Sequence, residues 1–202
     1  MPILSLEPQF FPADLFEAQA RPYYGPVCDR DPSGTPQPPR PRVWSVLHTR
    51  PRQEKSLART LHATQIPFFL PLARRWVSVR NRAVTSHNPL FPSYLFLLAD
   101  QEERLTVLST SRVVQAIPVA DQQRLVRDLI QIHRLLGLGA KVDGEDRLTP
   151  GTAVEIQSGP LAGLKGKIVQ EASRRRFVVE VDFIQRGASV MLDGFSLAPV
   201  RE

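Results

Sequence analysis

The chain has 202 residues, of which 42% are hydrophobic, and this is enough apolar material to build one ordinary domain or two small ones. Lys and Arg number 26 against 20 Asp and Glu, and the net charge of +6 favours an anionic partner such as nucleic acid, a membrane surface or an acidic protein. The single cysteine, Cys28, excludes an internal disulfide and a zinc site built on cysteine pairs.

The amino-terminal sequence bears on localisation. No apolar run approaches the roughly 20 residues that a transmembrane helix needs. Residues 1–16 lack a positively charged start and contain Pro8 and Pro12, which is not the pattern of a secretory signal. We therefore expect a cytoplasmic protein without a membrane partner.

Residues 1–42 are rich in proline. Proline removes backbone donors and favours extended, solvated conformations, so the composition predicts a disordered extension over this range. An alternative remains, because four apolar residues lie close together near its start. They would form a short docking patch: Phe10, Phe11, Leu15 and Phe16.

From Val43 the pattern becomes regular. It predicts strands at 43–47, 68–72, 74–79, 83–86, 94–98 and 113–117, with Arg80, Asn81 and Arg82 at a basic hairpin tip. Helices are expected after Pro51, after Asp100, where Glu103 completes a capping box, and after Asp121, ending at Gly137. Their apolar faces are Leu57, Ala58 and Leu61; Leu105 and Leu108; and Leu125, Leu129, Ile132 and Leu136. This order predicts an α+β, ferredoxin-like domain with an added hairpin over residues 43–137.

The remaining sequence is of a different kind. Residues 138–148 contain glycine and charged residues and are predicted to be a linker. Short candidate strands follow at 152–156, 167–172, 177–182, 188–192 and 197–200. Their spacing predicts a small five-stranded, SH3-like β-barrel over residues 149–202.

The clearest motif runs from Gly151 to Ile168. Two strands are joined by a loop that contains Pro160 and in which Gly159, Gly163 and Gly166 permit positive φ. A phosphate-binding P-loop does not fit, because its first glycine and its hydroxyl residue are replaced. The segment resembles the KOW motif of NusG-type factors and some ribosomal proteins, and the alternative is a generic SH3-like barrel loop.

A second motif, PLFPSYLF, runs from Pro89 to Phe96. Two prolines bracket Phe91 and impose an extended entry into the strand. Together with Trp44–Thr49 and the following helix, it resembles the amino-terminal domain of the NusG family. Its sequence is closer to the specialised, RfaH-like paralogs than to housekeeping NusG. The two motifs occur in the family's order and the resemblance covers residues 43 to 200.

The resemblance implies a contact with the clamp helices of RNA polymerase. The family's polymerase-facing apolar positions fall on His48, Phe91, Tyr94 and Phe96. An exposed aromatic cluster is a reasonable docking surface for a protein. The alternative is that Tyr94 and Phe96, at strand spacing, face the core.

The resemblance also implies contacts with nucleic acid. Non-template DNA is expected at or beside Arg50, Arg52, Arg59, Ser111 and Arg112, and upstream DNA at the hairpin residues Arg74, Arg75, Arg80 and Arg82. Arginine suits this task because its planar fork reaches phosphates and base edges. Nascent RNA is a further candidate partner. The alternative is an ordinary solvated, charged face.

In the carboxy-terminal domain the family's partner-binding positions fall on Ile184 and Arg186, with Phe183 beside them. The partner implied is a small-subunit ribosomal protein or the termination factor Rho. The alternative is that these are ordinary residues at the edge of the barrel.

No enzymatic pattern is present in the sequence. The four histidines are scattered and no paired-carboxylate pattern occurs, so we expect no catalytic residues, metal or cofactor. We expect a monomeric elongation or antitermination factor that suppresses polymerase pausing, specific for certain operons. The alternatives are a housekeeping NusG that acts with Rho, and a ribosome- or RNA-binding KOW protein without a polymerase role.

Overall fold

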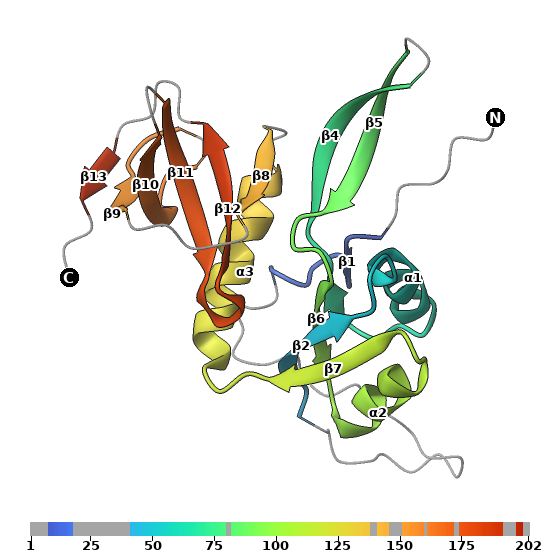
Figure 1. The fold of residues 1–202 in the computed structure, drawn as a ribbon. Coiled ribbons are helices and arrows are strands. Elements are labelled where there is room, and N and C mark those ends of the chain that lie inside the picture. Colours follow the sequence, from blue (N-terminus) through green and yellow to red (C-terminus); the bar gives the residue numbers. More distant parts are fainter. Residues whose placement is uncertain are drawn as a thin grey trace. The chain divides into compact units, whose positions relative to one another are not determined.

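The structure is a computed structural model that describes residues 8–17, 41–79, 82–137, 141–145, 151–159, 161–171, 174–191 and 197–199. The chain divides into two compact units (Figure 1). The first comprises Met1–Leu70 and Pro92–Ala120, and the second Pro71–Phe91 and Asp121–Glu202. The mixed α/β architecture predicted from the sequence is present.

A five-stranded sheet organises the first unit (Figure 1). Its strands, in spatial order, are β1 (Phe10–Phe11), β3 (Phe68–Phe69), β6 (Tyr94–Ala99), β2 (Val43–Thr49) and β7 (Val113–Pro118). All neighbouring strands are antiparallel, so β2 and β3 run in the same direction with β6 between them. Helix α1 (Glu54–Ala63) connects β2 to β3, and α2 (Gln101–Ser109) connects β6 to β7.

The two helices of this unit form where the sequence predicts them. Helix α1 buries Leu57, Ala58 and Leu61, as the sequence predicts. The predicted capping box begins α2, because the Asp100 side chain accepts from two backbone N–H groups and Glu103 binds the Asp100 N–H. The predicted apolar face of α2 is wrong for Leu105, which is 59% exposed, whereas Val107 is buried and Leu108 is half-buried. Residues two apart lie on opposite sides of a helix, so only one of them can face the sheet.

The second unit contains the predicted hairpin. Strands β4 (Leu72–Val79) and β5 (Arg82–Pro89) pair antiparallel from Leu72 opposite Pro89 to Val79 opposite Arg82. The tip, residues 80–81, lies outside the described residues. The hairpin prediction is therefore confirmed for its two strands.

The carboxy-terminal strands form an antiparallel sheet. In spatial order they are β13 (Leu197–Pro199), β9 (Thr152–Ile156), β10 (Lys165–Glu171), β11 (Arg174–Val181), β12 (Arg186–Met191) and β8 (Val142–Glu145). Five of them correspond to the five strands predicted from the sequence. The sixth, β8, lies within the predicted linker, where Val142 is buried and pairs with Val190 of β12. Within the described residues no pairing joins β8 to β13, and the predicted closed barrel is not found there.

Helix α3 (Gln122–Gly137) packs on this carboxy-terminal sheet. It begins at Asp121, whose side chain accepts the Arg124 N–H at 2.8 Å. It contacts β11 and the short 3-10 helix η2 (Asp182–Ile184), and Leu135, rather than the predicted Leu136, completes its buried face. The Gln131 side-chain oxygen accepts the Lys165 N–H, and Arg134 donates to the Ala162 carbonyl oxygen, each at 2.8 Å. The last helix of the predicted amino-terminal domain thus clusters with the second unit.

The glycines of the KOW-like motif are needed for two different reasons, backbone conformation and space. Gly159 and Gly163 adopt positive φ, at 85° and 82°, as the sequence predicts. Gly166 is not among the glycines with positive φ, and lack of space explains the glycine there. A Cβ there would clash with the Val178 carbonyl oxygen and lie 2.8 Å from the Phe177 ring.

We expect Gly166→Ala to destabilise the carboxy-terminal sheet by about 1–3 kcal/mol, because the backbone of β11 would have to move away from β10. Gly137→Ala is the matched control, since a Cβ there meets nothing within 4 Å. Denaturant unfolding of the two variants measures the difference. Equal stability of both would contradict the close β10–β11 approach.

Candidate functional site

One end of the five-stranded sheet carries a stacked aromatic pair. His48 on β2 lies directly opposite Tyr94 on β6, so their side chains share a face of the sheet. The two rings stack with centroids 5.5 Å apart at 28°, and both side chains are half-buried. The pair therefore presents aromatic surface to solvent.

The backbone around Tyr94 is held by the neighbouring elements. Ser93, which precedes it, has φ of 66°. The Ser93 N–H donates to the buried Glu54 carboxylate at 2.8 Å, and its carbonyl oxygen accepts the Thr49 N–H at 2.9 Å. These bonds join α1, the PLFPSYLF turn and β2, so the orientation of the His48–Tyr94 pair is fixed by packing.

The expectation of an exposed four-residue aromatic cluster is wrong for two of its members. Phe96 is 0% exposed and Phe91 is 1% exposed. Phe96 lies on the same sheet face as Tyr94, opposite Val46, and its ring stacks against Phe69 at 6.2 Å. The alternative, that a residue of this strand faces the core, holds for Phe96. Within this set, His48 and Tyr94 are the side chains available for a partner.

Two loops bring basic residues together at the same end of the first unit. The Arg50 N–H donates to the Arg112 carbonyl oxygen at 2.8 Å, which joins the β2–α1 loop to the α2–β7 loop. Both loops turn tightly, since Arg52 and Ser111 have φ of 64° and 58°. The Arg112 guanidinium lies 3.4 Å from the hydroxyl of Thr60, the residue that follows Arg59 on α1. The structure thus gathers the five residues predicted to face non-template DNA, and Arg50, Arg52, Arg59 and Ser111 are exposed.

The hairpin arginines are only partly described. Arg74 and Arg75 are exposed on β4, and the Arg75 guanidinium lies 3.6 Å from the Asp143 carboxylate of β8. Arg80 lies outside the described residues. The backbone of Arg82 belongs to β5, but its side chain is outside the described part of the structure.

The carboxy-terminal sheet exposes apolar residues near η2. Phe183 is 37% exposed, and Ile184 and Arg186 beside it are half-buried. Met191 at the end of β12 is 41% exposed, and no pattern in the sequence distinguished it. Of the glycine loop, Gly159, Gly163 and Gly166 are described, whereas Pro160 lies outside the described residues.

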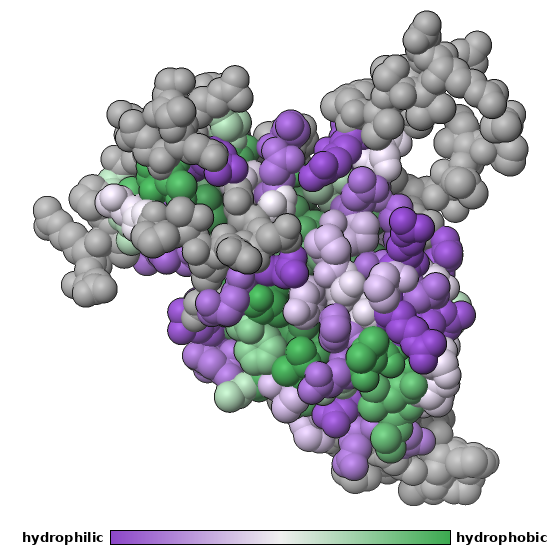
Figure 2. Space-filling model, in the orientation of Figure 1, coloured by the Kyte–Doolittle hydropathy of each residue, from purple (hydrophilic) through white to green (hydrophobic). Residues whose placement is uncertain are grey.

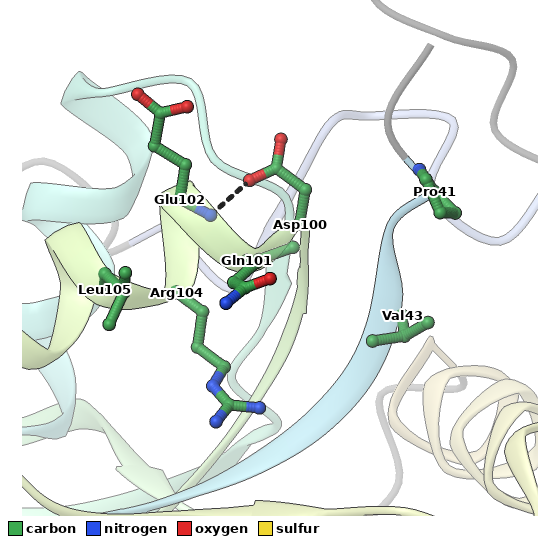
Figure 3. Close-up of a pocket in the computed structure, with 8 residues that line it drawn as sticks. Pro41, Val43, Asp100, Gln101, Glu102, Arg104 and Leu105 are labelled. Atoms are coloured by element: carbon green, nitrogen blue, oxygen red, sulfur yellow. Dashed lines mark hydrogen bonds between the residues drawn. The ribbon is translucent and has the colours of Figure 1, made fainter.

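An open hollow of about 690 Å³ lies at the start of α2 (Figure 3). Apolar residues of the wall include Pro41, Val43 and Leu105, and the charged residues are Asp100, Glu102 and Arg104. The Asp100 carboxylate caps α2 by accepting the Glu102 N–H at 2.8 Å and the Glu103 N–H at 2.9 Å. The Asp100 carboxylate is therefore engaged in the helix cap.

Apolar surface covers the neighbouring part of the first unit. Figure 2 shows hydrophobic surface over the region of α2 and β7. Leu105 on α2 and Val114 on β7 are 59% and 60% exposed. Among the described residues, no group of three His, Cys, Asp or Glu side chains could hold a metal ion, and no helix is long and apolar enough to cross a membrane.

Comparison with known proteins identifies the part of the chain that holds the stacked pair and the basic loops. A protein-family model described as NusG, transcription termination factor nusG, matches residues 42–137. Residues 42–137 are therefore similar to the NusG family. We call this segment the NusG-family region. No curated protein matches the chain.

Two solved structures align with most of the chain at low identity. Thermotoga maritima NusG, in a structure concerned with domain interaction, is 21% identical with a TM-score of 0.41, covering 79% of this chain and 98% of that one. The MjSpt4:Spt5 complex in conformation B gives 14% identity and a TM-score of 0.23, covering 79% of this chain and 99% of that one.

The NusG-family region contains every predicted polymerase- and DNA-facing residue. It begins at residue 42, one residue before β2, and it ends with α3. It excludes β1 and the carboxy-terminal strands. It includes the hairpin β4–β5 and α3, which cluster with the second unit.

Proposed function

We propose that this protein is a transcription elongation or antitermination factor that binds RNA polymerase through its NusG-family region. The observation that carries the proposal is the family match over residues 42–137. It is supported by the half-exposed His48–Tyr94 stack, which lies on a hydrogen-bonded sheet and offers a partner aromatic surface at little cost in conformational entropy. The clamp helices of the polymerase are the partner that the family resemblance implies.

The proposed mechanism is mechanical. The region docks on the clamp, holds it closed and suppresses pausing, while the basic loops Arg50–Gln53 and Thr110–Arg112 face the non-template strand. The PLFPSYLF motif favours an RfaH-like, operon-specific factor. A ribosome-binding protein without a polymerase role is disfavoured, because it would require residues 43–137 to have an unrelated fold.

The test is transcription by the host polymerase through a strong pause site, with and without the purified chain. We expect the chain to shorten the lifetime of the paused complex. An unchanged pause lifetime at a saturating concentration of folded protein would contradict the proposal.

A second candidate is a general factor that acts with Rho. The description of the family, which names a termination factor, favours it. The same transcription assay with Rho added distinguishes the two. Increased transcript release in the presence of the chain would support the termination role, and decreased release would support antitermination.

We propose that the carboxy-terminal sheet is a KOW-type module whose partner, a small-subunit ribosomal protein or Rho, contacts Phe183, Ile184 and Arg186. Phe183 supports this, since a 37% exposed phenylalanine close to a basic residue is a suitable anchor for a protein partner. Met191, 41% exposed, extends the apolar surface available in this module.

Substitution of the basic loops tests the nucleic-acid interaction. We expect Arg50→Gln with Arg52→Gln to weaken binding to a single-stranded DNA oligonucleotide. The slope of log affinity against log salt concentration should fall by about 0.7 for each phosphate that the protein no longer neutralises. Filter binding over a series of salt concentrations measures this slope.

The matched control is Arg124→Gln with Arg127→Gln, which removes the same charge from exposed positions on α3. It should leave the salt slope close to that of the unsubstituted chain. Equal losses of affinity for the two double variants would show that net charge, and not the loop surface, determines binding.

A further inference from the structure

The amino-terminal segment Gln9–Glu17 is not part of the NusG-family region, yet it is seated on the sheet of that region. Strand β1 pairs with β3, with Phe10 opposite Phe69 and Phe11 opposite Phe68. The Gln9 carbonyl oxygen accepts the Leu70 N–H at 2.6 Å, which continues the pairing beyond the strand. The segment thus adds a strand to the outer edge of the sheet.

The side chains of the segment cover both faces of this edge. Successive residues of a strand point to opposite faces. The Phe11 ring meets His62 of α1, with centroids 5.5 Å apart and ring planes at 79°. Phe10 lies on the other face, where its ring is 6.2 Å from that of Phe16. The edge of the sheet is therefore enclosed from two sides.

A tight turn then returns the chain onto the sheet. The Leu15 N–H donates to the Pro12 carbonyl oxygen at 3.0 Å. Leu15 is 0% exposed, and the Phe16 ring packs edge-on against Phe69 at 4.9 Å. Phe69 in turn stacks on Phe96, so Phe16 covers an aromatic row that runs into the sheet.

The segment lies outside the stretch that matches the family. The match begins at residue 42, and β3, β6, β2 and β7 all lie within it. The sheet is therefore a four-stranded family element to which β1 has been added from an extension. Strand addition with side-chain pockets is a common mode of peptide recognition.

We propose that the β3 edge of the sheet is a peptide-binding site, filled in cis by Gln9–Glu17. The site takes a peptide in which two adjacent aromatic residues are extended along β3. A proline, two intervening residues and a leucine–aromatic pair follow in a tight turn. The two aromatic residues bind the two faces of the edge, and Leu15 and Phe16 are the anchors. The inference does not depend on the role of the protein in transcription.

Tethering explains why a weak site would be occupied. The segment is joined to residue 41 by residues 18–40. Covalent linkage raises the effective concentration of the segment at the site to about 1 mM. A site with a dissociation constant near 100 µM would then be filled in about nine molecules of ten, and it would still exchange with a free peptide.

The test uses the full chain. A site-specific protease sequence is inserted between Ser33 and Gly34, and a fluorescent dye is attached to Cys28, the single cysteine. After cleavage, fluorescence anisotropy reports whether the labelled amino-terminal fragment stays on the protein. We expect high anisotropy above about 100 µM protein, and a fall when excess unlabelled peptide of residues 8–17 is added.

Variant peptides locate the anchors. The Leu15→Ala peptide should compete at least about thirtyfold more weakly, because a fully buried leucine is removed. The Ala13→Ser peptide is the matched control, since Ala13 is exposed, and should compete as well as the unsubstituted peptide.

Three results would overturn the proposal. An immediate loss of anisotropy on cleavage, with an unchanged circular dichroism spectrum, would show that the segment has no affinity of its own. Unfolding of the rest of the protein once the fragment dissociates would show that the segment is part of the hydrophobic core. A fragment that no excess of peptide displaces would not be an exchangeable ligand.

Discussion

Phe96→Ala is expected to destabilise the first unit by about 3–5 kcal/mol, the range for removing a phenylalanine from a packed core. Phe96 is 0% exposed, lies in the middle strand of the five-stranded sheet and stacks on Phe69. Its removal leaves a cavity between β3 and β2. A failure of this variant to bind polymerase would therefore report unfolding and not the removal of a docking side chain.

The measurement is denaturant unfolding followed by tryptophan fluorescence. Trp44 is 4% exposed on β2 and lies opposite Leu98 of β6, so it reports on this sheet. The only other tryptophan, Trp76 on the hairpin, is to be substituted by phenylalanine in every variant measured, so that Trp44 is the only tryptophan that fluoresces.

Leu105→Ala is the control for the Phe96 experiment. Leu105 is 59% exposed on α2, and a change at such a surface position is expected to alter the free energy of unfolding by no more than about 0.5 kcal/mol. If Phe96→Ala were as stable as Leu105→Ala, Phe96 would not lie in the core.

His48→Ala with Tyr94→Ala is expected to weaken binding to the host polymerase about thirtyfold or more while the protein stays folded. The two rings form a half-exposed stack, and removal of a central aromatic anchor at a protein interface costs at least about 2 kcal/mol. The Trp44 unfolding curve checks that the sheet is intact. Val114→Ala, 60% exposed on β7 of the same sheet, is the control and should bind as the unsubstituted chain does.

The contrast between Phe96 and Tyr94 shows how far the sequence predicts this site. Alternation along a strand places Tyr94 and Phe96 on one face, but it does not predict which residues of that face are exposed to solvent. That boundary depends on Phe69 and on Phe16 from the amino-terminal segment, which cover the Phe96 end of the face. The family resemblance indicated these two residues of one strand face, and tertiary packing makes Phe96 a core residue and Tyr94 a surface residue.

Local signals predicted the regular elements well. The Asp100–Glu103 capping box and the Asp121 cap occur as expected, because both depend on side chains close in sequence. Strand β8 was not predicted, since its sequence, VDGE, is mostly polar, and it forms by pairing with β12, more than 40 residues away. Strand β1 was hidden for a similar reason, because two residues in a proline-rich stretch become a strand only beside β3.

The arrangement of the basic loops could not be predicted from the sequence either. Arg50 and Arg112 are distant in sequence, and the hydrogen bond from the Arg50 N–H to the Arg112 carbonyl oxygen brings their loops together. The family resemblance indicated the individual arginines. Only the structure shows that they lie together at one end of the first unit.

The measurement that tests the central claim most directly is the affinity of the intact chain for its host RNA polymerase, compared with the same polymerase whose clamp-helix tip has been replaced by a short linker. We predict saturable binding to the intact enzyme and an affinity about thirtyfold or more lower when the tip is absent, equal to the effect of His48→Ala with Tyr94→Ala. Equal affinity for both polymerases, with the folded chain, would contradict docking of the NusG-family region on the clamp.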